Sequence, residues 1–462
     1  MAKKKEKTLE EKLQEALVPE NQWPYILPEN WCWTRLENVA NWGSGGTPSR
    51  KHPEYYQGNI PWIKTGELKD DFIYDAEEHI SEEAISKSNA KLFPVNTVVL
   101  AMYGATIGKA GIMGCELATN QACACGVSNE SINYRFLFEY IKSQKDGFIA
   151  SGKGGAQPNI SQQIIKSYPI PLPPLPEQKR IVYRIESLFS KLDEAKEKIQ
   201  QVLDGAEMRK AAILHKAFTG ELTKTWRKEN GISEDSWEVK KLKDITTPKA
   251  GFAFNSKKFT SEGYQIIRMG NLYGGKLDLD RVPVFYAPEN IDEKIKKRAM
   301  LHDNDIVITL TGTKYKRDYG YAVLIKEPVN LFLNQRILAL SPIEKIVNPT
   351  FLLYSLRSKD FRDIFFSNET GGVNQGNVSS KFVENIKIKI PLLEEQREIV
   401  KVLNHQLEFV DDTTKICKDA YEQIDTMKKS ILAKAFRGEL GKNNPTEDSA
   451  LKLLKEVLQD KF

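Results

Sequence analysis

The chain has 462 residues, of which 67 are Lys or Arg and 62 are Asp or Glu, and its formal net charge is +5. At ~150 residues per domain, this length excludes a single small module. A hydrophobic content of 40% beside a charged content of 28% excludes a disordered polyelectrolyte. No apolar run approaches the ~20 residues of a membrane span, and the basic N-terminus lacks the apolar stretch of a secretory signal. We therefore expect a soluble cytoplasmic protein that enters no membrane.

Cysteine and histidine are too few and too scattered to predict a disulfide framework or a metal site. The chain has five of each. Cys123 and Cys125 are separated by a single residue, and no Cys/His partner pair has the spacing of a zinc site. The sequence therefore predicts buried or surface thiols and no bound metal.

The N-terminal part of the chain predicts a tail followed by a globular domain. In the tail, residues 1–30, the segment 9–17 has the spacing of an amphipathic helix. The domain, residues 31–172, should mix helices and strands. Within it the apolar run 93–102 opens with turn residues and predicts a strand, whereas residues 134–142 have helical spacing.

A long helix is predicted within residues 173–222. Prolines at 173, 174 and 176 can precede a helix but cannot lie in its interior, so the helix should run from 177 to 218. Gly220 should end it as a C-cap residue, and 42 residues of helix would span ~63 Å. Apolar residues alternate along it by four and three positions, the heptad pattern of a coiled coil: Ile181, Ile185, Leu188, Leu192, Ala195, Ile199, Val202 and Ala206.

The second half of the chain repeats the first. After a linker, residues 223–236, the second domain should occupy 237–390, with a strand over 302–310 and a helix over 350–357. The second long helix lies in 391–440, with Gly438 as its C-cap, and the tail 441–462 carries an amphipathic helix over 450–458.

The repeat is clearest in the two long helices. Glu177-Gln178 recurs as Glu395-Gln396, and 212–222 matches 430–440 at the same offset. Weaker matches connect 119–121 with 333–335 and 157–161 with 375–379. Ile399, Leu403, Val410 and Ile424 continue the apolar seam in the second helix, where polar residues make it less strict.

These features predict an α+β fold with two globular mixed domains joined by two long antiparallel coiled-coil helices. Neither helix can bury its apolar stripe alone, and the chain returns along the second helix after building the second domain. The two domains would then lie at opposite ends of a two-helix rod related by a pseudo-twofold axis. The alternative is that each helix packs on its own domain or on another chain.

No catalytic pattern emerges from the sequence. The segment 104–110 resembles a phosphate loop, but it has one residue too few between its glycines and lacks the Ser or Thr that holds magnesium. Asn348-Pro349-Thr350-Phe351 resembles the base-binding turn of adenine methyltransferases, but Thr350 replaces its second proline, so we expect a turn leading into a helix. We therefore expect a binding or scaffolding protein.

Loops that combine glycine with basic and amide side chains recur in both domains. Arg and Lys can contact phosphates or guanine, and Asn and Gln can contact adenine in the major groove. For any one of them the alternative is a surface loop without a ligand, but their occurrence in both halves favours DNA binding. The candidates are Thr47, Ser49, Arg50, Lys51, Lys64, Lys153, Gln157, Asn159, Lys257, Lys258, Arg268, Asn271, Lys314, Lys316, Arg317, Asn374, Gln375 and Asn377.

The charge is divided unevenly between the two domains. Residues 237–390 carry a surplus of +8, whereas residues 31–172 have a net charge of −1. A neutral first domain is unusual for a DNA reader, so partner subunits would have to supply much of its hold on phosphates.

The layout resembles the specificity (S) subunit of type I restriction–modification systems. The resemblance rests on 173–182 and 391–400, on the Lys-Ala-Phe-x-Gly-Glu-Leu endings at 216–222 and 434–440, and on three motifs of the first domain, 46–49, 55–56 and 60–62. It covers roughly residues 30–440. It identifies the two globular parts with the target recognition domains of that family.

The resemblance implies that the chain has no catalysis of its own. Two methyltransferase (M) subunits would dock on the helices and bring S-adenosylmethionine, and restriction (R) subunits would join the full complex. Each domain would recognise one half of a bipartite, asymmetric site in double-stranded DNA, with adenine N6 methylated in each half. The helices would set the spacer, which should be short because each ends in a single Gly-Glu-Leu.

Two alternative functions stay open at this point. One is a stand-alone bivalent DNA-binding regulator or antirestriction protein on the same scaffold, and the other is a coiled-coil scaffold without a nucleic-acid role. The two tails lie outside the resemblance, and we hypothesise that they contact the methyltransferase subunits.

Overall fold

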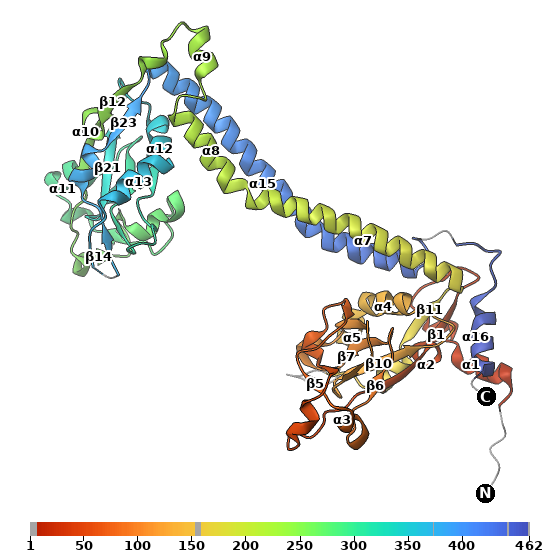
Figure 1. Ribbon diagram of the computed structural model, residues 1–462. Coiled ribbons are helices and arrows are strands. Elements are labelled where there is room, and N and C mark those ends of the chain that lie inside the picture. Colours follow the sequence, from red (N-terminus) through yellow and green to blue (C-terminus); the bar gives the residue numbers. More distant parts are fainter. Residues whose placement is uncertain (1–6, 153–158, 373, 441–442, 461–462) are drawn as a thin grey trace. The chain divides into compact units, whose positions relative to one another are not determined.

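The computed structural model describes residues 7–152, 159–372, 374–440 and 443–460. The chain divides into two compact units (Figure 1). The first unit holds residues 1–199 and 420–462, and the second unit holds residues 200–419. Each unit therefore combines one globular domain with one segment of each long helix.

Three antiparallel or mixed sheets build the first domain. β1 (Cys32–Arg35) pairs with β11 (Pro169–Leu172), so the first and last strands of the domain lie together. The five-stranded sheet has the order β2 (Ala40–Ser44), β10 (Cys123–Ser128), β7 (Val98–Ala101), β8 (Ala110–Met113), β4 (Phe72–Ile73). The four-stranded sheet has the order β5 (His79–Ile80), β3 (Ile60–Ile63), β9 (Leu117–Thr119), β6 (Leu92–Phe93), in which β3 and β9 are parallel.

Short helices surround these sheets in the first unit. The α-helices are α1 (Leu9–Ala16), α2 (Leu36–Val39), α3 (Glu82–Lys87), α4 (Tyr134–Ser143), α5 (Lys145–Ala150), α6 (Gln162–Ser167) and α16 (Ala450–Asp460). Single 3-10 turns occupy η1 (Glu20–Gln22), η2 (Pro53–Tyr56), η3 (Thr65–Glu67) and η4 (Gly104–Thr106).

The second domain repeats this plan. β12 (Glu238–Lys241) pairs with β23 (Lys387–Ile390), and β18 (Thr311–Gly312) pairs with β22 (Gly376–Asn377). One four-stranded sheet has the order β13 (Thr246–Ala250), β21 (Ile337–Pro342), β17 (Ile306–Thr309), β19 (Ala322–Leu324). The other has the order β14 (Phe259–Thr260), β16 (Phe285–Tyr286), β15 (Tyr264–Ile267), β20 (Leu331–Leu333), in which β15 and β20 are parallel.

The remaining elements of the second unit are also short. The helices around the second domain are α9 (Lys224–Glu229), α10 (Leu242–Ile245), α11 (Glu293–Ala299), α12 (Pro349–Arg357), α13 (Lys359–Ser367) and α14 (Ser380–Asn385). The 3-10 segments are η5 (Glu234–Ser236), η6 (Ser256–Lys258), η7 (Met269–Gly275) and η8 (Pro288–Asn290).

The same capping residues start equivalent helices in the two domains. Asn133 and Asn348 each accept two backbone N–H groups at the start of α4 and α12. Ser161 and Ser379 do the same with one N–H each for α6 and α14. Pro349 follows Asn348 at the first position of α12, where a proline costs no hydrogen bond. The expectation of a turn leading into a helix at 348–351 is confirmed.

The two predicted strands are shorter than the sequence suggested, for the same reason in both domains. The strand expected over 93–102 is split by a turn before β7, in which Asn96 has a φ of +68°. The strand expected over 302–310 is β17 alone, preceded by a turn in which Asn304 has a φ of +66°. Asparagine tolerates this left-handed conformation better than most residues, so a turn forms in each predicted segment and the strand begins only after it.

The two long helices are α7 (Leu175–Asp204) with α8 (Ala206–Phe218), and α15 (Leu393–Phe436). The first helix was expected to be continuous, but it is interrupted at Gly205, which keeps right-handed helical angles. The backbone N–H of Gly205 still bonds to the carbonyl of Gln201, and that of Arg209 bonds to Gly205. Glycine weakens a helix interior by ~1 kcal/mol, which accounts for the break.

The helices pair in antiparallel fashion within each unit. In the first unit Lys196 forms an ion pair with Asp425 at 2.8 Å and Asp193 pairs with Lys428, so residue numbers rise on α7 as they fall on α15. In the second unit Lys210 pairs with Asp411, and α8 lies beside α15 (Figure 1). This confirms the predicted fold class of two mixed domains joined by long paired helices.

The predicted seam residues are enclosed to different degrees. Ile181, Ile185, Ile399, Leu403, Val410 and Ile424 are buried, and Leu188, Leu192, Ile199 and Val202 are half-buried. Ile181 and Ile185 also belong to the core of the first domain, as Ile399 and Leu403 do in the second. Each helix therefore packs on its own domain at one end as well as on the other helix.

The repeated Glu-Gln pair anchors each long helix to its domain. The Gln178 amide donates to the carbonyls of Ser131 and Pro173 and accepts the N–H of Asn133. Gln396 is equally buried and has the same three partners at the equivalent positions, Ile346, Pro391 and Asn348. A buried side-chain amide with all of these bonds fixes the helix start relative to the cap of α4 or α12.

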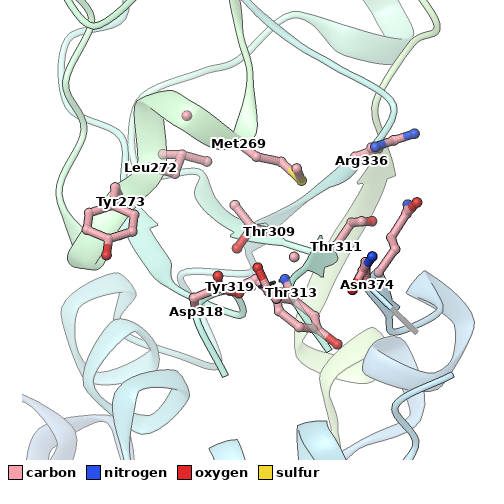
Figure 2. A pocket seen from close by; sticks show the side chains of 13 residues that line it. Met269, Leu272, Tyr273, Thr309, Thr311, Thr313, Asp318, Tyr319, Arg336 and Asn374 are labelled. Carbon is pink, nitrogen blue, oxygen red and sulfur yellow. Dashed lines mark hydrogen bonds between the residues drawn. The ribbon is translucent and has the colours of Figure 1, made fainter. Parts of the chain in front are cut away.

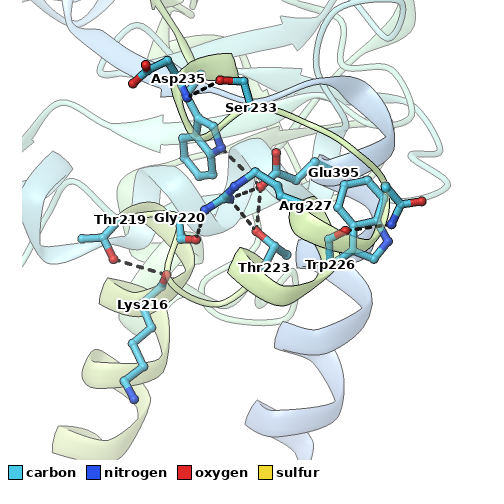
Figure 3. A network of polar contacts seen from close by, with 11 residues as sticks. Lys216, Thr219, Gly220, Thr223, Trp226, Arg227, Ser233, Asp235 and Glu395 are labelled. Carbon is cyan, nitrogen blue, oxygen red and sulfur yellow. Dashed lines mark hydrogen bonds and ion pairs between the residues drawn. The ribbon is translucent and has the colours of Figure 1, made fainter.

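The glutamates of these pairs have different surroundings. Glu177 is buried and accepts a hydrogen bond from the indole of Trp31 at 2.8 Å. Glu395 accepts one from Trp237 at 3.2 Å and, in addition, hydrogen bonds from Thr223 and Arg227 of the linker (Figure 3). Arg227 therefore pairs with a carboxylate that has no exposed surface.

The two tails form helices that lie side by side in the first unit (Figure 1). Their apolar residues belong to the core of the first domain: Leu9, Leu13, Ala16, Leu454 and Leu458. Lys455 pairs with Glu10 at 3.4 Å, and Arg180 of α7 forms a two-pronged ion pair with Glu447. Any partner would therefore meet the polar faces of the tail helices.

Candidate nucleic-acid interface

Four loops of the second domain converge where the parallel strands β15 and β20 end. Carboxyl ends of parallel strands lie at the same edge of a sheet, which brings residues 268–275 and 334–336 together. The N–H of Asn334 donates to the carbonyl of Ile267 at 3.2 Å. The other two loops, 311–319 and 374–377, are joined by the pairing of β18 with β22 and by the Thr311 hydroxyl, which donates to Asn377 at 2.9 Å.

Two open cavities lie among these loops. The first, of about 370 Å³, is shown in Figure 2. The second, of about 550 Å³, shares Met269, Gly270 and Arg336 with it. Loop ends on a rigid sheet are common positions for ligand contacts, and cavities of this kind can admit the edge of a base or a phosphate.

Both cavities are lined by polar side chains together with apolar ones, and the first also has two tyrosines. The first is lined by Met269, Gly270, Leu272, Tyr273, Thr309, Thr311, Gly312, Thr313, Asp318, Tyr319, Arg336, Asn374 and Gln375. The second is lined by Arg268, Met269, Gly270, Asn271, Arg281, Val282, Asn334, Gln335, Arg336 and Ile337.

Asp318 is the acidic residue of the first cavity. Its carboxylate accepts the backbone N–H of Thr313 at 2.8 Å. Partial burial acts to raise its pKa, but hydrogen bonds from Thr313 outweigh that effect and leave the pKa below the ordinary value. The group is therefore an ionised acceptor at neutral pH, of the kind that can accept a hydrogen bond from cytosine N4.

The first domain has the same loop framework. The N–H of Asn120 donates to Ile63 at 3.0 Å, as Asn334 does to Ile267, and Met102 donates to the carbonyl of Ala122 at 2.9 Å. The corresponding bond in the second domain runs from Leu310 to Arg336 at 3.0 Å. Asn159 forms a bridge with Tyr103 as Asn377 does with Thr311.

These bonds establish which residues are equivalent. Ala122 occupies the place of Arg336. Lys64 occupies the place of Arg268, because each follows the strand that is parallel to its neighbour and each donates its N–H to the residue three positions later. The two domains therefore share a framework and differ in side chains at the loop ends.

A single carboxylate pairs with two cations in the first domain. Glu78 pairs with Lys64 and with Arg50, each at 2.6 Å, and the Arg50 guanidinium stacks over Tyr56 at 4.0 Å. The hydrogen bond to Lys64 lowers the pKa of Glu78 and raises that of Lys64, so both stay charged. The cluster gives both cations a counter-ion, and its three charges sum to +1.

The second domain lacks this carboxylate. The backbone N–H of Trp62 donates to Glu78, and the equivalent bond runs from Ile266 to Val284, both at 2.8 Å. Val284 therefore stands where the first domain has Glu78. Arg268 instead donates one bond to the carbonyl of Val282 at 3.0 Å and forms no ion pair with the described residues.

The candidates predicted in the first domain are differently placed. Thr47 donates to Gln121, and Ser49 and Lys51 lie on the exposed turn before η2. Arg50 and Lys64 belong to the ion cluster with Glu78. Asn159 lies beside Tyr103, while Lys153 and Gln157 fall outside the described residues.

Among the candidates of the second domain, Arg268, Asn271, Asn374 and Gln375 line the cavities. Asn271 is buried, and its amide is consumed by bonds to Arg268, Asp278 and Arg281, so it holds the loop rather than meeting a ligand. Asn377 accepts the Thr311 hydroxyl and likewise braces its loop.

The predicted lysines and the remaining arginine do not line these cavities. Lys314 donates to the carbonyl of Gly371, and Arg317 pairs with Asp363 at 2.8 Å. Lys258 donates to Asn290, and Lys257 and Lys316 are exposed. They can contribute to the positive electrostatic potential of the domain, although they do not line the cavities at the loop ends.

Sequence reasoning missed Arg336, Arg281, Asp318 and the cavity tyrosines. A signal for Arg336 was present, because the Asn-Gln match of 120–121 with 334–335 is followed by Ala122 in one half and by Arg336 in the other. The two cavities could not be inferred, because they depend on how loops far apart in sequence meet.

Within the described ranges, no group of three or more His, Cys, Asp or Glu side chains could hold a metal ion. No helix among the described residues is both long and apolar enough to cross a bilayer. All five cysteines are unpaired.

The chain is similar to known proteins over most of its length. A family model for the type I restriction modification DNA specificity domain matches residues 28–204 and 234–425. The specificity subunit of the type I restriction enzyme MjaVIII of Methanocaldococcus jannaschii is 27% identical, over 90% of this chain and 95% of that protein. That of EcoBI of Escherichia coli is 26% identical, over 74% of each.

A solved structure supports the fold. The HsdS subunit from Thermoanaerobacter tengcongensis superposes with a TM-score of 0.65 at 20% identity, over 91% of this chain and 100% of that chain. The duplicated framework described above coincides with the two matches to the family model. The chain therefore belongs to the type I restriction modification DNA specificity domain family and is the DNA specificity subunit of a type I restriction–modification system.

Proposed function

We propose that this chain recognises DNA without catalysing a reaction, and that each domain recognises one half of a bipartite, asymmetric site. The observation that carries this proposal is the shared loop framework with different side chains at its ends. A framework repeated with Ala122 in one domain and Arg336 in the other suits two readers of different sequences. Two identical readers would instead suit a palindromic site.

Methyl transfer would then belong to partner subunits. Two methyltransferase subunits would bind S-adenosylmethionine and dock on the duplicated helical regions, and restriction subunits would join the full complex. The buried Glu-Gln anchors support this assignment, because they give both helices the same position on their domains and therefore offer two similar docking surfaces. The cytoplasm is the compartment where such a complex would meet DNA.

The test is sequence-resolved methylation in a host that lacks the system. Expression of this chain with its methyltransferase subunit should produce N6-methyladenine at one bipartite motif, and the methyltransferase subunit alone should produce none. Replacing residues 237–390 by the matching segment of a relative should change one half of the motif and keep the other half. No new motif, or one that forms without this chain, would reject the proposal.

A stand-alone DNA-binding regulator is the second candidate. It would bind a bipartite site tightly as the purified chain, whereas the specificity subunit should need the methyltransferase subunits for full affinity. The first domain is nearly neutral, and its Arg50 and Lys64 both pair with Glu78. Weak binding by the chain alone, as expected of a specificity subunit, is therefore favoured. Binding measured with and without the methyltransferase subunit distinguishes the two.

The contribution of the tails to docking should be tested on their polar faces. Deleting α1 or α16 would expose apolar residues of the first domain, so lost assembly would not identify a contact. Charge reversal at exposed positions such as Glu10 and Lys452 leaves the core intact. If the tails contact methyltransferase subunits, such variants should reduce co-purification; unchanged co-purification would remove the tails from the interface.

A further inference from the structure

Arg336 is held at the centre of the loop cluster by its backbone. Its carbonyl accepts the N–H of Leu310, and Ile337, which follows it, is the first residue of β21. The preceding Asn334 is fixed in turn by its bond to Ile267. The Cα of Arg336 is therefore placed by strands of two sheets, and its position is reproducible enough to select a ligand.

The side chain of Arg336 lines both cavities. Figure 2 shows it among the residues that line the first. It is exposed, and no hydrogen bond or ion pair of its guanidinium is formed with any of the residues that the structure describes. Other arginines of this domain are engaged: Arg317 with Asp363, Arg362 with backbone carbonyls and Arg357 with Ala322. Arg336 thus has a fixed backbone position and a guanidinium whose donors are available.

Guanine is the base that matches this group. It presents two acceptors, O6 and N7, on its major-groove edge, and a guanidinium fork can donate to both at once. Adenine presents one acceptor beside a donor there, and cytosine presents a donor, so neither can satisfy the fork. A phosphate also offers paired acceptors, but it carries no sequence information.

The neighbouring side chains favour a base over the backbone. Asn374 and Gln375 line the first cavity from another loop, and Asp318 adds an ionised acceptor. A carboxylate repels phosphate but can accept from the amino group of cytosine, the partner of guanine or a neighbouring base. We propose that Arg336 selects a guanine in the half-site recognised by the second domain, and that Ala122 leaves the first domain without this contact. This inference rests on the proposed function.

The test uses the assembled complex of this chain with its methyltransferase subunit. The wild-type methylated motif should contain a G·C pair at one position that Arg336→Ala no longer requires, with all other positions kept. Replacing that pair should weaken wild-type DNA binding by about 5- to 150-fold and leave binding of the variant unchanged. Arg336→Lys, which keeps the charge and loses the fork, should also lose the preference.

Lys257→Ala is the matched control, because Lys257 is an exposed cation of the same domain that lines neither cavity. It should weaken binding to all sequences equally and keep the motif. Uniform weakening by Arg336→Ala, or an unchanged motif in that variant, would overturn the guanine assignment while leaving the proposed function intact. A wild-type complex that methylates no specific motif would overturn both. Co-purification of each variant with the methyltransferase subunit confirms that it folds.

Discussion

The two domains are alike where they join the helices and unlike where the loops converge. Gln178 and Gln396 make the same three hydrogen bonds, and Asn133 and Asn348 cap the equivalent helix in the same way. At the loop ends, however, Glu78 is matched by Val284, and Ala122 by Arg336. The residues that attach each domain to its helix are thus separate from the residues at the loop ends. Two domains with the same attachment can therefore recognise different DNA sequences.

A second contrast lies at the base of the long helices. Glu395 is enclosed by the linker, whose Arg227 also donates to the carbonyl of Gly220 at 2.6 Å (Figure 3). The equivalent Glu177 accepts one side-chain hydrogen bond from the described residues, and its donor is the indole N–H of Trp31. The linker therefore supplies a buried counter-charge to one helix start and not to the other.

The largest expected effect comes from breaking this buried ion pair. Arg227→Met should lower the stability of the second unit by about 3–5 kcal/mol, because Glu395 would be left buried without its counter-charge. Hydrogen–deuterium exchange should report faster exchange in 220–237 and 393–400. The double variant Arg227→Met, Glu395→Met should recover most of the loss. A single variant as stable as the wild type would show that the pair contributes nothing.

Removal of the repeated amides should have a slightly smaller effect, and an equal one in the two units. Gln178→Leu and Gln396→Leu each abolish three bonds and leave buried backbone groups unpaired, at a cost of about 2–4 kcal/mol. Exchange should accelerate around 131–137 in one variant and around 346–352 in the other. Each variant serves as the control for the other, and acceleration in both units at once would contradict independent anchoring.

The sequence predicts the local and periodic features of this molecule better than its long-range contacts. The seam from Ile181 to Val202, the caps Gly220 and Gly438 and the repeated Glu-Gln pair are local or periodic signals, and they led to the helices and the duplication. The burial of Gln178 against Ser131 is a long-range contact that no local pattern reveals. A duplicated motif shows that a residue matters in both halves, but not what it touches.

The interface was predicted less well because its geometry depends on side-chain competition. Lys64 and Arg268 look equivalent in the sequence, yet only Lys64 of these two pairs with a carboxylate, Glu78, and the strand pairing that brings Glu78 there was not predicted. Asn271 has the side chain of a base reader but uses all of its amide to hold its own loop. Composition identified the right loops, whereas the partners of each side chain decide which residues can meet DNA.

Exchanging the Glu78 and Val284 positions should alter the affinity of each domain for DNA. Glu78→Gln would release Arg50 and Lys64 and should tighten binding of the complex about 3- to 10-fold at low salt, with a steeper salt dependence. Val284→Glu should do the reverse by placing a carboxylate near Arg268. Fluorescence anisotropy over a salt series measures both. Equal affinities across wild type and variants would mean that these cations do not face DNA.

The smallest expected effect is a pH dependence confined to the first unit. Burial raises the pKa of Glu177 above its ordinary value, since the Trp31 bond and the nearby Arg180 offset it only in part. The folded state therefore holds a proton that the unfolded chain releases, so the free energy of unfolding falls as pH rises from the unfolded pKa through the folded one. Glu177→Gln should reduce this slope, to which the buried Glu139 of the same unit also contributes. It should also stabilise the first unit above that window, as denaturation followed from about pH 4 to 8 would measure. Glu395→Gln should instead lower stability, because it removes the partner of Arg227; if both variants shifted stability in the same direction, the contrast between the two helix starts would be lost.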